Sequence, residues 1–224
     1  MNNADEVIPK LLSTHLTISP RPEVTRRASH DLFECIEQSE HKRLSESQAR
    51  YVFSQVADAV EYLEEHGITH RDIKDENLVI DKNLKVRLLI LHLSKASLTN
   101  IYPQVKLIDF GSAIAVDPNQ PRPFYKSFYG TAAYASSEIL LKKDYQSAPA
   151  EIWTLGVLLS YLLAGVSPFP HVRDAVDGKI FLSEKIVGRI SDDAMDLMRQ
   201  CLDPNPDTRC TISQVKAHPW LGQK

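Results

Sequence analysis

The sequence predicts an α+β fold that is mainly helical and carries one small β-hairpin. Three observations predict this fold. Apolar residues recur at helical spacing between residues 49 and 63, two short β-branched runs lie at 77–81 and 104–110, and a long apolar stretch covers 153–163. Helices therefore dominate, and the two short runs suggest the hairpin.

Length, composition and charge limit the functional classes. The chain has 224 residues, of which 43% are hydrophobic and 25% are charged, and this composition is typical of one globular domain. The formal net charge of −3 gives no electrostatic reason to expect nucleic acid or an anionic membrane as a partner. Cys35, Cys201 and Cys210 lack the close paired spacing of a zinc site. We expect reduced thiols and an intracellular, cytoplasmic protein.

Neither a signal peptide nor a membrane-spanning segment is expected. The acidic N-terminal residues lack the apolar core of a signal peptide. The apolar stretch 153–163 is about a dozen residues long, whereas a helix that spans a bilayer needs roughly 20. This stretch is therefore expected to form a buried helix.

The elements are expected in a definite order. Residues 1–30 show little periodicity and are interpreted as a weakly structured leader. A short amphipathic helix is expected at 31–38. Ser45 and Gln48 have the spacing of a capping box, and the apolar repeat that follows predicts a long helix that Gly67 ends.

The β-branched runs 77–81 and 104–110 predict strands of a hairpin beside the sequence "HRDIKDEN" at 70–77. The turn-like sequence "DKN" follows the first run. From residue 148 the pattern is helical again, up to a closing "AHPWLG".

The sequence "HRDIKDEN" places a carboxylate, an ammonium and an amide at the spacing that suits phosphoryl transfer to a hydroxyl. This reaction needs an acceptor for the hydroxyl proton, cations on the phosphate oxygens and an in-line arrangement. Asp72 would accept or orient the proton, Lys74 would reach the transferring phosphate, and Asn77 would ligate Mg²⁺. Asp109, in "DFG" at a strand end, would bridge the metal to the β and γ phosphates of ATP.

These motifs resemble those of the larger, C-terminal lobe of eukaryotic protein kinases, over residues 31–221. The chain also contains "YGTAAY", "EIWTLGVLLSYLLAG" and "HPW" in the family's order. Lys74, two positions after Asp72, and the "GT" at 130–131 resemble the serine/threonine branch. Within that branch, "RDIKDENLVID", "LIDFGSA" and "FYGT" are most similar to fungal PAS-domain kinases. The resemblance implies ATP and Mg²⁺ as cofactors and a protein substrate phosphorylated on serine or threonine.

The resemblance also assigns supporting roles around this loop. His70 would pack near Phe110 and, together with Gly111, support the metal-binding loop; a role as metal ligand is not expected. Arg71 would pair with the activation segment.

Further roles follow from the same resemblance. Glu138 and Arg209 resemble the family's buried ion pair, which holds the activation segment to the lower lobe. Asp31 would bind the ATP ribose, and Val79 would form the floor of the adenine pocket. Glu76 matches a position that attracts arginine upstream of the target hydroxyl, and a solvated surface charge is the alternative.

Small departures from the family occur at four positions. Glu151 stands where most kinases place an aspartate that hydrogen-bonds the catalytic-loop backbone. Ser136 and Ser137 replace Ala-Pro, and Cys210 replaces a proline. These changes are expected to lower rigidity and to leave the chemistry intact.

The largest departure concerns the upper wall of the ATP cleft. A complete kinase carries a glycine-rich loop, a strand lysine and a helix glutamate ahead of this region. Residues 1–30 contain no glycine, and the context of Lys10 is unlike that of the strand lysine. We therefore expect the N-lobe to be largely absent and turnover by the isolated chain to be weak, because phosphate positioning supplies most of the rate.

A second departure is the segment 86–104, between the catalytic loop and "DFG". Its removal rejoins Lys85 to Val105 and restores the expected strand. It is either a real insertion, whose apolar residues 88–93 are covered by a partner, or a translated retained intron, which we favour. Left exposed, 88–93 would be an aggregation hazard.

Three alternatives for the function remain open. The first is a serine/threonine protein kinase domain that is weak or inactive as an isolated chain. The second is a catalytically dead binding module that docks proteins through its interlobe face or through 86–104. The third is an incomplete gene product of a full kinase. Because interfaces between domains bury roughly 600–1,500 Å², an exposed interlobe face is expected to bind another protein.

Overall fold

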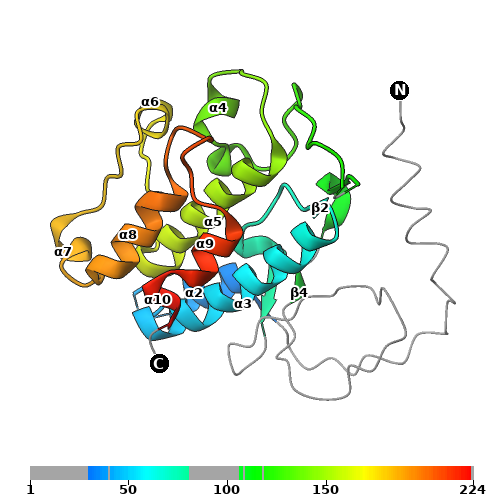
Figure 1. Cartoon of the computed structure of the whole chain (residues 1–224). Coiled ribbons are helices and arrows are strands. Elements are labelled where there is room, and N and C mark those ends of the chain that lie inside the picture. The colour runs from blue at the N-terminus through cyan, green and yellow to red at the C-terminus, as the bar shows by residue number, and fades with distance from the viewer. Residues whose placement is uncertain (1–29, 40, 81–105, 108, 118, 223–224) are drawn as a thin grey trace, which may run out of the picture.

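The computed structural model describes residues 30–39, 41–80, 106–107, 109–117 and 119–222. These residues form a helical body with short strands at one edge (Figure 1). Residues 1–29 of the leader expected at 1–30, and the whole insertion expected at 86–104, lie outside the described residues.

The first helices follow the local signals of the sequence. Helix α2 covers Leu32–Gln38, and helix α3 covers Glu46–Glu65. The capping box predicted before α3 is confirmed: the Gln48 backbone N–H donates to the Ser45 hydroxyl, and the Ser45 backbone N–H donates to the Gln48 carboxamide. Gly67 follows α3 with a φ of 71°, a left-handed conformation that suits glycine at a helix end.

The remaining helices lie after residue 109, apart from one turn within residues 70–77. Three are short 3-10 helices, at Asp75–Asn77 (η1), Phe110–Ser112 (η2) and Ala132–Tyr134 (η3). The α-helices are α4 (Ser137–Leu140), α5 (Ser147–Ala164), α6 (Val172–Val176), α7 (Glu184–Val187), α8 (Asp192–Cys201), α9 (Ile212–Ala217) and α10 (Pro219–Gly222).

Helix α5 is the centre of the core. It packs against α3 and α8, and Figure 1 shows it in the middle of the helical body. Trp153, Leu158 and Leu162 have no exposed surface, and buried residues lie on every side of the helix, which is typical of a core helix. By length and composition, α5 is the one helix among the described residues that could cross a membrane, but most of it is buried inside the fold. The prediction of a buried helix is confirmed.

The strands form two small antiparallel sheets. In the first, β3 (Leu78–Ile80) lies between β1 (His30–Asp31) and β4 (Lys106–Leu107). Pairing of Leu78 with Leu107 confirms the predicted pairing of the two β-branched runs. The connection between them lies in residues 81–105, outside the described part of the chain.

Strand β1 corrects two expectations. His30 was expected in the leader and Asp31 in the first helix, but the two residues pair with Ile80 and Val79. A strand of two residues has no periodicity from which it could be predicted, and its partner lies far along the chain. The second sheet, β2 (Ile68–Thr69) with β5 (Ile114–Ala115), was not predicted for the same reason.

Helices α5 and α8 approach each other closely at Gly156. A Cβ atom built on this glycine would lie 2.7 Å from Leu202 Cγ and 2.8 Å from Cys201 Cβ. Real Cβ atoms essentially never come this near to another heavy atom. The absence of a side chain at Gly156 therefore allows α8 to pack at its observed distance.

Gly156→Ala is expected to lower the free energy of unfolding, because the added methyl overpacks the contact with α8 at a cost of about 1–3 kcal/mol. The gain of about 1 kcal/mol in helix propensity offsets part of this cost, so a net loss of about 1–2 kcal/mol is expected when the overpacking cost lies in the upper part of its range. Urea unfolding followed by circular dichroism measures the change. Gly222→Ala is the matched control, since a Cβ there meets nothing within 4 Å. Equal stability of the two variants would contradict the close approach.

Candidate active site

The sequence "HRDIKDEN" forms a loop held at both ends by strands. It leaves β2 at Thr69 and enters β3 at Leu78. His70 and Ile73 have no exposed surface, so the loop is anchored in the core along its length. We call residues 70–77 the catalytic loop.

The Asp72 side chain is held by a hydrogen-bond network. The Thr131 hydroxyl donates to Asp72 Oδ1 at 2.7 Å, and Asn77 Nδ2 donates to Asp72 Oδ2 at 3.1 Å and to the Asp72 carbonyl at 2.8 Å. Lys74 Nζ donates to the Thr131 hydroxyl at 2.8 Å and lies 3.5 Å from Asp72 Oδ2. The structure thus brings together the predicted residues Asp72, Lys74 and Asn77.

Thr131 is a site residue that the sequence reasoning missed. The motif "GT" at 130–131 marked the serine/threonine branch only, although the same motif carries this hydroxyl into contact with the Asp72 carboxylate. The contact joins residues 59 positions apart, so local sequence patterns do not contain it.

Lys74 is a cation among acidic groups. Burial alone would lower the pKa of Lys74, but its hydrogen bond to Glu76 and the charges of Asp72 and Glu76 outweigh burial and raise the pKa above its usual value. Lys74 Nζ lies 2.9 Å from Glu76 Oε2, and the Glu76 side chain is about half exposed. Lys74 is therefore protonated at neutral pH, as a side chain that binds phosphate oxygens must be.

Asp75, one residue further along, faces the core. The Tyr134 hydroxyl donates to Asp75 Oδ1 at 3.0 Å. Burial raises the pKa of Asp75, although the bond from Tyr134 opposes this effect. This contact ties the catalytic loop to η3.

Glu151 of α5 supports the catalytic loop from below. The backbone N–H of Arg71 donates to Glu151 Oε2 at 2.7 Å, and Arg71 has a φ of 66°, a conformation that L residues rarely adopt. Glu151 is 3% exposed. Burial raises the pKa of Glu151 to about 7, although hydrogen bonds from the backbones of Arg71 and His70 lower it. The longer glutamate thus reaches the backbone that an aspartate usually contacts in the resembled family.

The Arg71 side chain contacts the segment between β5 and α4, which we call the activation segment (residues 116–136). Its guanidinium lies 4.8 Å from the ring centre of Tyr129 and 5.8 Å from that of Tyr125. Its Nε donates to the Ser112 carbonyl. Arg71 therefore joins the catalytic loop to this segment through cation–π contacts.

The "DFG" residues lie beside the catalytic loop. The rings of His70 and Phe110 meet edge to face at 4.8 Å, which places His70 in the packing role that the resemblance implies. Asp109 has a left-handed backbone with a φ of 64°, and its exposed carboxylate accepts a hydrogen bond from the Gly111 N–H at 3.1 Å.

Asn77 and Asp109 offer the oxygen ligands that Mg²⁺ prefers. Because Asn77 Nδ2 makes both bonds to Asp72, the carboxamide oxygen Oδ1 is the atom that would bind the metal. Among the described residues, groups of three or more His, Cys, Asp or Glu side chains that would hold a metal by themselves are absent.

The two residues assigned to the nucleoside are neighbours in the first sheet. Asp31 of β1 pairs with Val79 of β3, and Val79 is half-buried. The backbone thus brings together two positions that lie 48 residues apart in the sequence.

Glu138 and Arg209 form a buried ion pair. Arg209 Nη1 donates to Glu138 Oε1 at 3.0 Å, and Arg209 Nη2 donates to Glu138 Oε2 at 2.8 Å. The Arg209 guanidinium also donates to the carbonyls of Pro149 and Asp203, and it lies 5.0 Å from the ring centre of Trp153. Burial acts to raise the pKa of Glu138, but Arg209 outweighs burial and holds the pKa below its usual value.

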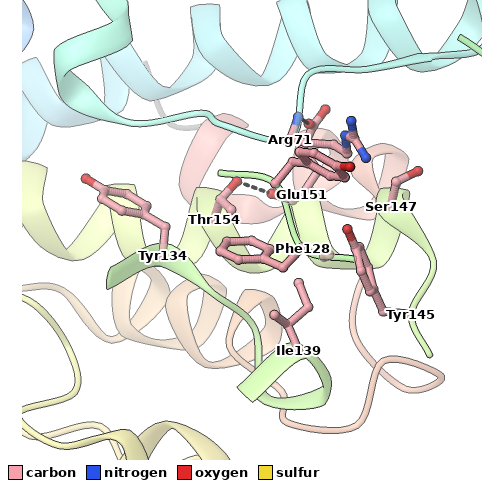
Figure 2. A pocket seen from close by; sticks show the side chains of 10 residues that line it. Arg71, Phe128, Tyr134, Ile139, Tyr145, Ser147, Glu151 and Thr154 are labelled. Atoms are coloured by element: carbon pink, nitrogen blue, oxygen red, sulfur yellow. Dashed lines mark hydrogen bonds between the residues drawn. The ribbon is translucent and has the colours of Figure 1, made fainter. Parts of the chain in front are cut away.

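A small pocket lies under the activation segment. Figure 2 shows Glu151 and Arg71 at one side of it, with the aromatic rings of Phe128, Tyr134 and Tyr145 around it. The Thr154 hydroxyl donates to the Glu151 carbonyl. Glu151 lines this pocket, and burial of its carboxylate is the cause of its raised pKa.

Comparisons with known proteins agree with this geometry. The family model described as "Protein kinase domain" matches residues 23–221. Serine/threonine-protein kinase pim-2 of Danio rerio is 35% identical over 191 residues, which are 85% of this chain and 53% of that protein. CBL-interacting serine/threonine-protein kinase 14 of Arabidopsis thaliana is 34% identical and is covered to 37%, with 81% of this chain aligned. Serine/threonine-protein kinase PSK2 of Saccharomyces cerevisiae is 33% identical and is covered to 15%, with 86% aligned. The chain spans about half or less of the length of these relatives.

Glu151→Gln is expected to remove a pH dependence of stability. The pKa of Glu151 is about 7 in the folded chain and about 4.3 in the unfolded chain, so folding takes up a proton between these values. The stabilisation by this proton is complete below the unfolded pKa and is lost as the pH rises through 7. Between pH 5 and 8 the unfolding free energy of the wild type should fall by roughly 2–3 kcal/mol relative to Glu151→Gln.

Urea unfolding at a series of pH values measures this difference. The control is Glu184→Gln, at the exposed start of α7, which should follow the wild type. Parallel pH profiles of the wild type and Glu151→Gln would show that Glu151 is ionised throughout and that the expected titration is wrong.

Arg209→Ala is expected to lower the free energy of unfolding by about 3–5 kcal/mol, because it leaves the buried Glu138 charge without its partner. Chemical denaturation measures the loss. Arg173→Ala is the control: Arg173 lies 3.8 Å from Asp177 at an exposed site, and such pairs contribute about 0–1 kcal/mol. A loss at Arg209 no larger than the loss at Arg173 would contradict a structural role for the buried pair.

Proposed function

The chain belongs to the protein kinase domain family, and from this premise we propose that it is a serine/threonine protein kinase domain. Its reaction would be the transfer of the γ-phosphoryl group of ATP to serine or threonine hydroxyls of proteins. One observation carries the proposal: the Asp72 carboxylate is held by Thr131 and Asn77 with the Lys74 ammonium 3.5 Å away. The three relatives described above are named as serine/threonine-protein kinases, which supports the proposal.

The catalytic loop would act by positioning. Asp72 would orient the substrate hydroxyl and accept its proton, because a carboxylate fixed by two donors keeps one orientation. Lys74 would bind an oxygen of the transferring phosphate, since its ammonium lies beside Asp72. Thr131 bridges the two side chains and would keep them aligned.

ATP and Mg²⁺ are the cofactors of this proposal. Asn77 Oδ1 and the Asp109 carboxylate would hold the metal, which neutralises charge on the phosphate oxygens when it is bound. Asp31 would bind the ribose, and Val79 would lie under the adenine. The pairing of β1 with β3 supports the last two assignments, because it places these residues side by side.

The substrate would be a protein with arginine upstream of the target hydroxyl. Glu76 supports this preference because it lies at the surface next to Asp72 and Lys74. Lys74 Nζ lies 2.9 Å from Glu76 Oε2. An arginine of the substrate would replace Lys74 as the partner of Glu76, and the Lys74 ammonium would then be free to bind the phosphate. A relation to the fungal PAS-domain kinases, a cytoplasmic location and a protein-binding interlobe face belong to the same proposal.

The polypeptide 1–224 by itself is proposed to turn over slowly. Residues 1–30 contain no glycine and therefore no glycine-rich loop over the phosphates. Asn77, Asp109 and the catalytic loop would bind the nucleotide from one side only. A loss of phosphate positioning lowers the rate by orders of magnitude.

Mg-ATP is expected to raise the melting temperature of the polypeptide 1–224, because the nucleotide binds the folded chain only. Asp109→Ala should abolish the shift, and Asp72→Asn should keep the shift but remove the remaining transfer of ³²P to a basic serine peptide. Asp207→Ala, at an exposed loop position, is the control for both measurements.

Three outcomes would change the proposal. A turnover of about 1 per second or more would contradict the slow turnover. Absence of a shift with Mg-ATP would favour a catalytically dead binding module. A transfer rate unchanged by Asp72→Asn would exclude Asp72 as the catalytic residue.

A further inference from the structure

Two cysteines meet in the core at the end of α8. Cys201 is the last residue of α8, and Cys210 lies directly before Thr211, the N-cap of α9. Their sulfur atoms are 3.8 Å apart, and the exposed fractions of the two side chains are 0% and 8%. The backbone N–H of Cys210 donates to the carbonyl of Gln200 at 3.4 Å, so the main chains lie side by side as well.

We propose that Cys201 and Cys210 are an oxidation site, at which hydrogen peroxide converts the two thiols into a reversible disulfide. The sulfur atoms are already in van der Waals contact, and the bond requires them to approach to about 2.05 Å. Rotation of the two short side chains supplies this movement, because the neighbouring backbones are already joined by a hydrogen bond.

Cys210 is the sulfur that reacts first. It is the more exposed of the two, and peroxide is small enough to reach a nearly buried atom. The contact with the Cys201 sulfur lowers the pKa of Cys210 despite burial, whereas the same contact and burial raise the pKa of Cys201. The thiolate, which is the nucleophile in such reactions, therefore forms on Cys210.

The reaction proceeds in two balanced steps. The Cys210 thiolate attacks one peroxide oxygen, the O–O bond breaks, and the hydroxide that leaves takes up a proton to become water. The Cys201 sulfur then loses its proton and attacks the sulfenic sulfur of Cys210; the S–S bond forms and a second water leaves. Two thiols lose two hydrogens, and one peroxide is reduced to two waters.

The disulfide would stiffen the loop 202–209, which contains Arg209, the partner of Glu138 just after the activation segment. Residues 202–209 contain Arg209, which pairs with Glu138, and Pro204, whose carbonyl accepts a hydrogen bond from the Ser137 hydroxyl. Cys210 also stands where the resembled family places a proline. A cross-link from Cys210 to Cys201 would therefore restore by a covalent bond the rigidity that a proline supplies.

Titration of the folded polypeptide 1–224 with hydrogen peroxide tests the proposal. Peptide mapping without reductant should find a link between Cys201 and Cys210, with Cys35 still a thiol. The melting temperature should rise by roughly 5 °C and return to its first value with dithiothreitol. Cys201→Ala and Cys210→Ala should lose the shift, and Cys35→Ala should keep it.

Two outcomes would overturn the proposal. The first is a product that contains Cys35 or a sulfinic acid at Cys210 in place of the link. The second is a linked protein that melts at the same or a lower temperature than the reduced protein. If the alanine variants do not fold, the wild type decides: in 8 M urea peroxide should show no preference for linking Cys201 to Cys210, whereas in the native chain it should form this link.

Discussion

Burial of α5 on all sides is the constraint on which the rest of the structure depends. This helix contacts the catalytic loop, packs against the buried ion pair of Glu138 and Arg209, and packs against α8. Glu151 accepts the Arg71 N–H, Trp153 lies under the Arg209 guanidinium, and Gly156 admits α8. Because one rigid helix makes these contacts, it fixes the positions of the catalytic loop, the activation segment and the C-terminal helices relative to one another.

The buried carboxylates of Glu138 and Glu151 are stabilised in different ways. Glu138 meets a guanidinium in a two-point contact that keeps it ionised. Glu151 is stabilised by backbone N–H groups, and burial raises its pKa to about 7. A buried carboxylate without a matching cation tends to take up a proton. The protonation state of Glu151, which supports the catalytic loop, therefore changes in the physiological pH range. Glu138, which pairs with Arg209, stays ionised there.

The loop 202–209 connects these features to the cysteine pair. The Pro204 carbonyl accepts a hydrogen bond from Ser137, and the Arg209 guanidinium pairs with Glu138. Both contacts lie where the activation segment enters α4. Cys201 and Cys210 stand at the two ends of the loop. A covalent change at the ends of this loop therefore acts on the ion pair without touching the catalytic loop, and it would make the anchor of the segment responsive to oxidants.

The sequence by itself determined the features whose causes are local. The capping box of Ser45 and Gln48, the long helix up to Gly67 and the apolar pattern of α5 depend on residues a few positions apart, and the ordered motifs assigned Asp72, Lys74 and Asn77 to one loop. Only the tertiary structure decided strand β1, the sheet of β2 with β5, the bond from Thr131 to Asp72 and the contact of the two cysteine sulfurs. It also decided the protonation of Glu151, whose contact with the Arg71 backbone joins positions 80 residues apart. The physical reason is that hydrophobic periodicity and capping act within a few residues, whereas desolvation and hydrogen bonds between distant residues exist only after the core has brought them together.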